Sequence, residues 1–369
     1  MRSTTGTCAL LVFSPLVLAM AAQPVIDRAI RHAVDMSPRL SADGKVLVWV
    51  RARDGNASLC VSPAPFGRPP AALPLGPALD PLPRVCLSLD GRHVFWKAKG
   101  AVWHCVLDDA RPGRPEKLSV KAGPFGLQTN ADGSVLAMLL DGPNSPRRSP
   151  SWRAVSTAVR TTAGWTQDKP LTPTREGQLA WGLRLDGVGR YLVFDLGGPK
   201  QAVRGADGWV ASALRLKGFN VRPSALSADG RLLLLRGRKH DERPARPELK
   251  NLSHVWLARR VDGRWQTPEL VLRDRQINFY NETLSPNGRW LMWVEFDRDE
   301  KMGILKTRLR LMRREAKGWT EPKTLVEQKG FLQFWNTALA DDGTAAWTTI
   351  GGQAMQSFVR APDGETIRL

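Results

Sequence analysis

Two short segments of the chain place an aromatic ring directly before an asparagine, at Tyr280-Asn281 and at Trp335-Asn336. Amide and aromatic groups at a concave surface are the groups with which small-molecule and peptide sites orient a ligand. Trp181 and Arg222 hold comparable positions, because all these residues lie six to eight positions before a glycine of a repeated turn. They are candidate ligand-binding residues. The alternative is that the rings pack between neighbouring elements as core.

A basic segment supplies a second kind of candidate. Arg236, Arg238 and Arg243 stand close together, with Lys239 and Arg246 among them. Such a group would attract an acidic or polar ligand in a salt-sensitive way, while the rings and amides would fix its orientation. We therefore add these three arginines to the candidate ligand-binding residues.

Patterns for catalysis or metal binding are weak. The sequence contains no Gly-x-Ser-x-Gly elbow of a serine hydrolase. The histidines His32, His93, His104, His240 and His254 show no ligand-like spacing. The acidic cluster Asp297-Arg298-Asp299-Glu300 is followed by Lys301 and Met302, where a calcium loop needs an oxygen ligand and a glycine. We assign no catalytic residue, no metal site and no cofactor, although a glycosidase-like pair of carboxylates across a cleft stays open.

The charge of the chain points to anionic partners. Its 54 Lys and Arg residues against 35 Asp and Glu residues give a formal net charge of +19. Nucleic acid, an acidic polysaccharide or a phospholipid surface would suit such a charge, as would a basic surface that simply stays solvated. No basic run is paired with the spaced aromatics of a nucleic-acid module. We expect a protein or a polar or acidic ligand as partner, and no nucleic acid.

The N-terminus has the features of a signal peptide over residues 1–21. Arg2 precedes an apolar stretch from Cys8 to Met20, and Ala19-Met20-Ala21 is a small-residue cleavage motif, so cleavage is expected before Ala22. Cys8 precedes the apolar stretch and does not end it, which argues against a lipid anchor. No later apolar run reaches the length of a membrane span. The prediction is an exported protein, periplasmic or secreted.

The elements that position the candidate residues follow from a repeat. A phrase that ends in Asp-Gly or Asn-Gly recurs seven times, each time before an apolar stretch. The glycines of this repeat are Gly44, Gly91, Gly133, Gly187, Gly230, Gly288 and Gly343. Asp-Gly between two apolar runs predicts a β-hairpin with a type I′ turn, because both central residues need positive φ.

A second turn follows each first one, clearest at Gly164-Trp165, Gly208-Trp209, Gly263 to Trp265 and Gly318-Trp319. Most of these turns lead into a segment with an internal proline, which is typical of a sheet edge. Each unit is therefore predicted to be a four-stranded antiparallel blade. Residues 22–369 are predicted to form a single all-β domain, a seven-bladed β-propeller, and we expect a monomer.

Blades three, five and six carry about ten extra residues between their second and third strands, counted between the two turn glycines. In an antiparallel meander the Asp-Gly and Gly-Trp turns share one face of the ring, here called the turn face. The extra residues are expected on the opposite face, here called the insertion face. The first strands would begin there, at the mouth of the central channel, with the candidate ring and amide residues.

The repeat, as in Leu40-Ser41-Ala42-Asp43-Gly44, resembles the TolB-type, WD40-like propeller repeat of exported bacterial proteins. The resemblance covers the expected mature chain and implies a binding scaffold. Similar blades also form the gating propeller of prolyl oligopeptidases and the catalytic propeller of oligogalacturonate lyases. The chain departs from TolB because only residues 22–36 precede the first repeat, which leaves no room for the N-terminal α/β domain.

We therefore expect a non-catalytic binding or scaffold protein that takes a protein or a polar ligand at the insertion face. The alternative is a propeller enzyme, similar to a polysaccharide lyase or a glycosidase, with its site at the channel mouth. The mature chain would keep Cys60, Cys86 and Cys105. Their expected strand positions are too far apart for a disulfide, so three buried free thiols are predicted.

Overall fold

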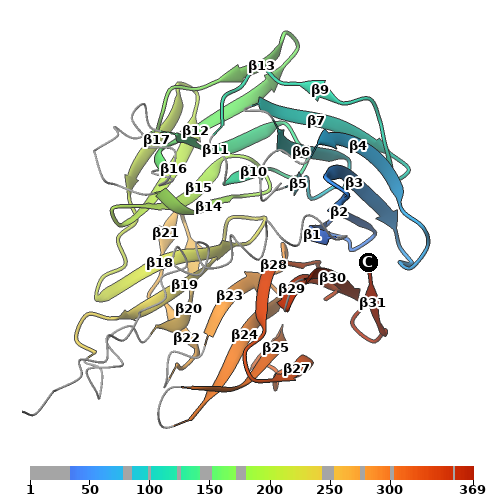
Figure 1. The fold of residues 1–369 in the computed structure, drawn as a ribbon. Helices are drawn as coiled ribbons and strands as arrows, with labels where there is room; N and C mark the ends of the chain where they lie inside the picture. The colour runs from blue at the N-terminus through green and yellow to red at the C-terminus, as the bar shows by residue number, and fades with distance from the viewer. Residues whose placement is uncertain are drawn as a thin grey trace, which may run out of the picture.

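The computed structural model describes residues 34–77, 85–98, 101–122, 126–141, 152–171, 180–242, 253–274, 279–299, 303–351 and 354–369. In these ranges the regular elements are β-strands, arranged in seven antiparallel sheets around a common centre (Figure 1). The predicted fold class, an all-β seven-bladed propeller, is confirmed. The predicted signal peptide, 1–21, lies outside the described residues and stays a prediction.

Each blade is a continuous stretch of chain. Blade 1 contains β1 (Val34–Leu40), β2 (Val46–Arg53), β3 (Asn56–Pro63) and β4 (Ala71–Pro77). Blade 2 contains β5 (Val85–Leu87), β6 (His93–Ala98), β7 (Ala101–Asp108), β8 (Arg111–Pro112) and β9 (Glu116–Lys117). Blade 3 contains β10 (Leu127–Thr129), β11 (Val135–Asp141), β12 (Trp152–Thr161) and β13 (Gly164–Gln167). Blade 4 contains β14 (Ala180–Leu185), β15 (Tyr191–Leu196), β16 (Pro199–Gly205) and β17 (Gly208–Ala213).

The last three blades follow the same order. Blade 5 contains β18 (Phe219–Leu226), β19 (Leu232–Lys239), β20 (His254–Val261), β21 (Arg264–Trp265) and β22 (Glu269–Leu272). Blade 6 contains β23 (Phe279–Leu284), β24 (Trp290–Arg298), β25 (Ile304–Glu315), β26 (Gly318–Trp319) and β27 (Lys323–Lys329). Blade 7 contains β28 (Gln333–Leu339), β29 (Ala345–Gly351), β30 (Ala354–Arg360) and β31 (Thr366–Arg368).

The fourth strand is interrupted in blades 2, 5 and 6. In each, two short strands pair one after the other with the same third strand, as β21 and β22 pair with β20. Pro115, Pro268 and Pro322 stand between the two pieces. Proline cannot donate a ladder hydrogen bond and is tolerated at an edge, so it divides this outermost strand without breaking the blade.

The Asp-Gly turns are bonded into a closed ring. The amide of Ala42 in blade 1 donates to the carbonyl of Leu89 in blade 2 (2.8 Å), and Asp341 of blade 7 donates back to the carbonyl of Ala42 (2.7 Å). The other junctions are Asp90 to Ala131, Ala131 to Gly187, Gly187 to Ala228, Ala228 to Pro286, and Asn287 to the Asp341 carboxylate. We call these bonds the turn ring. They join all seven blades, and among the described strands none is shared between the first blade and the last.

Blade 4 departs from the expected repeat. The bond that closes the turn runs from Gly44 to Ser41 in blade 1, and in blade 4 it runs from Gly189 to Asp186. Gly189, and not Gly187, is therefore the turn glycine, with φ of 74°. Asp186 takes the place of the serine, and its carboxylate accepts the amides of Arg190 and Tyr191 at 2.8 and 2.9 Å. The prediction of Gly187 was wrong because this turn carries an Asp-Gly pair two positions early.

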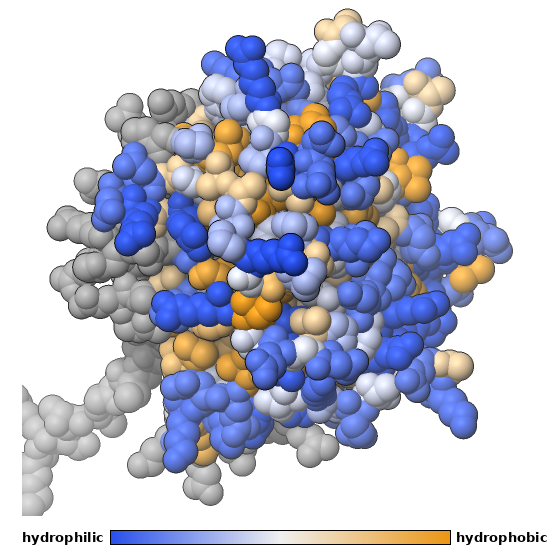
Figure 2. Space-filling view, turned by 90° about the vertical axis from the view of Figure 1, so that its right-hand side faces the viewer, coloured by the Kyte–Doolittle hydropathy of each residue, from blue (hydrophilic) through white to orange (hydrophobic). Residues whose placement is uncertain are grey.

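The core lies between neighbouring blades. One cluster, for example, joins Trp49 and Cys60 of blade 1 to Ala338 and Ala346 of blade 7. Cys60, Cys86 and Cys105 are buried free thiols, as predicted, and each belongs to a different cluster. On the side of the molecule that carries β3, β4 and β31, Figure 2 shows mostly hydrophilic residues with small separate hydrophobic groups. Among the described residues, no helix has the length and apolar character needed to cross a bilayer.

Candidate functional site

Five of the first strands carry a β-bulge at the same point, near their insertion-face ends. The bulges lie in blades 1, 4, 5, 6 and 7, between the pairs Met36/Arg39, Trp181/Arg184, Pro223/Ala225, Tyr280/Thr283 and Trp335/Ala338. In four of these strands one bulge residue has positive φ: Ser37 (57°), Gly182 (59°), Asn281 (54°) and Asn336 (49°). Bulges re-aim side chains and are frequent beside binding sites. In these five innermost strands the bulge therefore changes the direction of the backbone near the insertion face.

Four of the candidate residues occupy equivalent positions in their first strands. Counted from the true turn glycine, Gly189, Trp181 lies eight positions before it, as Arg222, Tyr280 and Trp335 do in their blades. The sequence analysis had placed Trp181 six positions before Gly187. The structure thus makes the candidate set more regular than its sequence spacing indicated.

Tyr280 and Asn281 join blade 6 to blade 7. The Tyr280 hydroxyl accepts the amide of Phe334 (3.1 Å), and its ring stacks on Phe296 with centroids 5.0 Å apart. The Asn281 amide donates to the carbonyl of Phe334 (2.6 Å). Burial raises the pKa of the Tyr280 hydroxyl well above its usual value. These contacts give both residues a structural role between blades, the alternative that the sequence left open.

The other ring and amide candidates are described by their positions and their burial. Trp335 packs against an apolar cluster that joins blades 1, 2 and 7, and it remains half-buried. Asn336 is half-buried as well, with φ of 49°. For Trp181 the structure gives the backbone position in β14, opposite Asp195 in β15.

Arg222 and Arg236 face each other across the β18–β19 pair of blade 5, and each contacts a buried acid of a neighbouring blade. Arg222, whose side chain is 77% exposed, lies 3.4 Å from the Asp195 carboxylate of blade 4. Arg236 lies 3.5 Å from Glu282 of blade 6, whose side chain is only 4% exposed. Ser224 donates to the other Glu282 oxygen (3.1 Å). Two arginines and two acids thus form a polar seam between blades 4, 5 and 6.

The remaining arginine candidates extend this seam outward. Arg238 lies two residues beyond Arg236 in β19 and is half-buried. Arg243 lies outside the described residues, so its assignment stays a prediction. The structure therefore brings Arg222 and Arg236 together, with Arg238 next along the strand.

Sequence reasoning missed a second arginine pair, Arg39 and Arg184. Both occupy the same bulge position, in the first strands of blades 1 and 4, and both guanidiniums fold back onto the preceding carbonyl, of Pro38 (2.8 Å) and Leu183 (2.7 Å). Among the described residues neither forms an ion pair. The signal was an arginine five positions before each turn glycine, which became visible only after blade 4 was aligned on Gly189.

The positive charge of Arg39 acts on Arg184 across the ring of blades. Burial, together with the positive charge of Arg39, lowers the pKa of Arg184 to about 10, against a smaller opposite effect of Glu282. Burial also lowers the pKa of Arg39. Blades 1 and 4 lie three steps apart in a ring of seven, so this influence runs through the centre of the ring (Figure 1). Two poorly solvated positive charges therefore lie on the first strands of blades 1 and 4.

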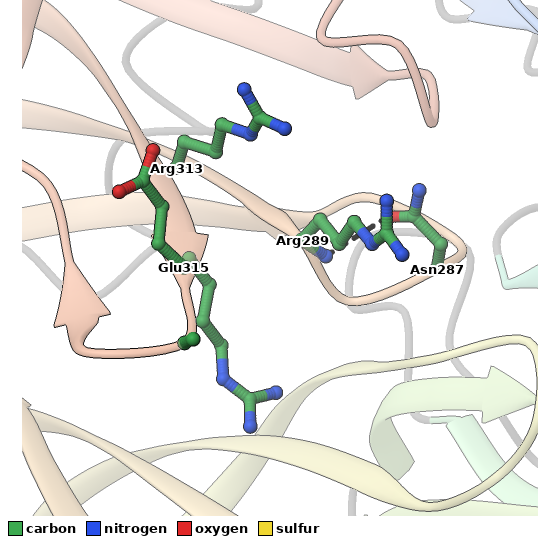
Figure 3. A pocket seen from close by; sticks show the side chains of 6 residues that line it. Asn287, Arg289, Arg313 and Glu315 are labelled. Atoms are coloured by element: carbon green, nitrogen blue, oxygen red, sulfur yellow. Dashed lines mark hydrogen bonds between the residues drawn. The ribbon is translucent and has the colours of Figure 1, made fainter.

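Arginines also gather on the turn face. An open basin of about 530 Å³ in blade 6 is lined by Asn287, Arg289, Arg313, Arg314, Glu315 and Ala316. Figure 3 shows Arg289 on the Asn-Gly turn and Arg313 at the end of β25, on facing sides of this space. The basin lies far from the bulges, at the opposite end of the same strands.

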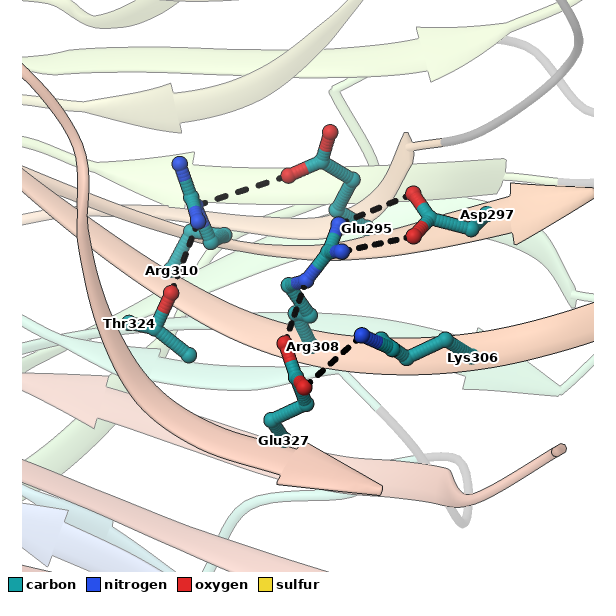
Figure 4. Close-up of polar contacts among 7 residues, drawn as sticks. All are labelled: Glu295, Asp297, Lys306, Arg308, Arg310, Thr324 and Glu327. Carbon is teal, nitrogen blue, oxygen red and sulfur yellow. Dashed lines mark hydrogen bonds and ion pairs between the residues drawn. The ribbon is translucent and has the colours of Figure 1, made fainter. Parts of the chain in front are cut away.

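The acidic cluster that the sequence singled out is held by arginine. Arg308 binds both oxygens of Asp297 (2.8 and 2.6 Å) and one oxygen of Glu327 (2.7 Å), which also pairs with Lys306 (2.8 Å), as Figure 4 shows. These pairs tie β24, β25 and β27 together in the long hairpin of blade 6. No group of three potential metal ligands occurs among the described residues.

Two histidines meet in blade 2, although their sequence spacing gave no sign of it. His93 Nδ1 lies 2.9 Å from His104 Nε2, and His104 Nδ1 lies 2.7 Å from Glu116. Both rings are buried, and His104 stacks on Phe95 with centroids 4.6 Å apart. This chain of hydrogen bonds links β6, β7 and β9 inside blade 2. In β6 and β7 these residues lie diagonally across one hairpin, a relation that requires the strand register.

Comparisons with known proteins show the fold. No protein-family model matches the sequence, and a search of curated proteins found no match. Among solved structures, an acylaminoacyl peptidase from Pyrococcus horikoshii is 13% identical over 91% of this chain and 52% of its own, with a TM-score of 0.59. The β-propeller domain of the Trilobed protease from Pyrococcus furiosus, which has an open velcro topology, is 12% identical over 91% of this chain and 95% of its own, with a TM-score of 0.55.

The solved structures that match the chain include TolB proteins, as the resemblance of the repeat led us to expect. TolB from Acinetobacter baumannii is 13% identical over 79% of this chain and 65% of its own, with a TM-score of 0.47. The chain spans about half the length of the peptidase, whose activity belongs to that whole protein. The seven antiparallel sheets make the chain a seven-bladed β-propeller protein, and the likenesses to the two Pyrococcus proteins agree with that fold.

Proposed function

We propose that this protein is an exported, non-catalytic binding protein that takes a polar or acidic ligand at the centre of its insertion face. The observation that carries the proposal is the pair Arg39 and Arg184, two half-buried guanidiniums near the axis without ion-pair partners among the described residues. Keeping two like charges poorly solvated costs stability, and an anionic ligand would remove that cost. Arginine suits the task because its fork matches a carboxylate bidentately.

The seam beside this pair supports the same ligand. Arg222 is exposed and could guide an acidic group inward, while Arg236 is held in place by Glu282. The proposal of export rests on the predicted signal peptide. The proposal of a monomeric state rests on the closed ring of blades. Both remain proposals.

The enzyme alternative finds less support. The two acids nearest to the seam, Asp195 and Glu282, are each engaged by arginine, at 3.4 and 3.5 Å. A general acid or base needs a free carboxyl within reach of a substrate. The described part of the insertion face therefore offers arginines that can bind an anionic ligand, while its two acids are less suited to act as a general acid or base.

The test uses a fluorescein-labelled hexaglutamate peptide, with hexalysine as the control peptide, and measures binding by fluorescence anisotropy. Each arginine bond to a carboxylate contributes about 1.5–3 kcal/mol, so the double variant Arg39→Gln/Arg184→Gln is expected to bind hexaglutamate at least about 10-fold more weakly. Its melting temperature should be unchanged or higher, because two unpaired charges are removed.

The matched control is Arg53→Gln, on the second-to-third-strand turn of blade 1, whose side chain is 75% exposed. It should bind like wild type. If the control and the double variant weaken binding equally, or if wild type prefers hexalysine, the proposed site is wrong.

A further inference from the structure

The turn of blade 6 lacks a carboxylate that most other turns possess. In five blades an aspartate precedes the turn glycine and accepts the amide two residues later: Asp43, Asp90, Asp132, Asp229 and Asp342. In blade 6 this acceptor is Asn287, which takes the amide of Arg289 at 2.9 Å. The geometry of the turn is kept, and its negative charge is gone.

Without a carboxylate in the turn of blade 6, three neighbouring arginines are not neutralised by it. Arg289 follows the turn directly, and Arg313 and Arg314 end the third strand of the same blade. The amide of Arg314 donates to the carbonyl of Arg289 (2.6 Å), which holds the two sides of the basin at a fixed spacing. Arg313 lies over the ring of Trp290, with its guanidinium carbon 5.5 Å from the ring centroid. Among the described residues, none of the three guanidiniums has an ion pair.

The surrounding charges do not cancel this excess. Burial and the positive charge of Arg259 lower the pKa of Arg314, against a smaller opposite effect of Glu269. On the other side, Arg289 lies within electrostatic reach of Asp341, whose carboxylate already accepts the amide of Asn287 (2.6 Å). Positive charges therefore lie close together here, and the Asp341 carboxylate beside them already accepts a hydrogen bond.

We propose that this basin binds a phosphomonoester. Three guanidiniums against the single carboxylate of Glu315 leave two positive charges along its lining, which match the two negative charges of a phosphomonoester near neutral pH. In the view of Figure 3 the Glu315 carboxylate points away from Arg289, so it does not neutralise that guanidinium directly. Arginine forks bind phosphate oxygens in pairs, and a space of about 530 Å³ holds a phosphate with a sugar-sized or headgroup-sized body.

This site lies on the turn face and is independent of the proposed function on the insertion face. The phosphate could belong to a soluble compound or to a lipid headgroup. The test therefore has two arms: inorganic phosphate, titrated by calorimetry at pH 7.5 against sodium acetate, and phosphatidylcholine vesicles with or without 20 mol% phosphatidic acid, followed by flotation.

The variants are Arg289→Gln and Arg313→Gln, with Asn287→Asp to restore the carboxylate that the other turns carry. Arg92→Gln is the matched control, because Arg92 holds the place of Arg289 in blade 2, after a turn that keeps Asp90. Each basin variant is expected to weaken binding about 10-fold in whichever arm wild type binds, while Arg92→Gln stays within about 2-fold. Melting curves exclude variants that unfold.

Saturable binding of inorganic phosphate supports the site with a soluble ligand. Flotation only with phosphatidic acid vesicles, lost in Arg313→Gln, supports it with a lipid headgroup. The proposal is overturned if wild type binds in neither arm. Equal weakening by Arg92→Gln and Arg289→Gln would also overturn it, because binding would then follow the overall charge of the protein.

Discussion

Replacement of Ser41 by alanine tests how strongly each turn depends on its own serine. Ser41 is fully buried, and its hydroxyl accepts the amide of Val46 (2.9 Å) and donates to Asp43 (2.7 Å). Ser41→Ala removes both bonds and leaves the Val46 amide without its side-chain acceptor. At about 1 kcal/mol for each bond, the free energy of unfolding should fall by about 2 kcal/mol.

The expected change in melting temperature follows from the size of the chain. An entropy of unfolding of roughly 2.1 cal/mol/K per residue gives a drop of about 3 °C for a chain of this length. Scanning calorimetry and urea unfolding measure the two quantities. Ser62→Ala is the control, since Ser62 is also buried in blade 1 but its hydroxyl has one long bond, to Pro63 (3.4 Å). If Ser41→Ala and Ser62→Ala lower stability equally, the turn bonds contribute nothing specific and the reasoning fails.

Two further predictions concern titratable groups. Burial lowers the pKa of both His93 and His104, so the unfolded chain takes up protons first as the pH falls below about 6.5. The free energy of unfolding should therefore decrease from pH 7 to pH 5, and urea titrations in which His104→Gln keeps the full decrease would contradict this. Burial also raises the pKa of the thiols, to about 11 for Cys60 and Cys86 and to about 12 for Cys105. At pH 8 a thiol reagent should count three cysteines in urea and react slowly with the native mature protein, and rapid native labelling would refute their burial.

The architecture could be predicted from the sequence because its signals are local. A turn glycine with positive φ, such as Gly44 (70°), between two apolar runs encodes a hairpin within a few residues. The same local logic misassigned Gly187, because Asp186 replaces the expected serine and an Asp-Gly pair precedes the functional Gly189. Hydrogen bonding across the turn decides between them, and it is invisible in the sequence.

The candidate site was only partly predictable, because its contacts cross between blades. Tyr280 was selected as a ring that could orient a ligand, yet its hydroxyl is used by Phe334 of the next blade. Arg39 and Arg184 are 145 positions apart in the sequence, and the charge of Arg39 reaches Arg184 only when the ring closes. A single sequence reveals the period of the repeat, but not which side chains meet across its axis.

The turn ring also limits how this protein can change in evolution. Ala131 both accepts the amide of Asp90 and donates to Gly187, so an insertion in its turn would break two blade junctions at once. In the part of the chain that the structure describes, the link Asp54-Gly55 between the second and third strands of blade 1 carries no such bond to a neighbouring blade. New sequence can therefore enter on the insertion face without disturbing closure. A designer who wished to graft a recognition loop should choose Asp54-Gly55, because lengthening that hairpin leaves all seven junctions intact.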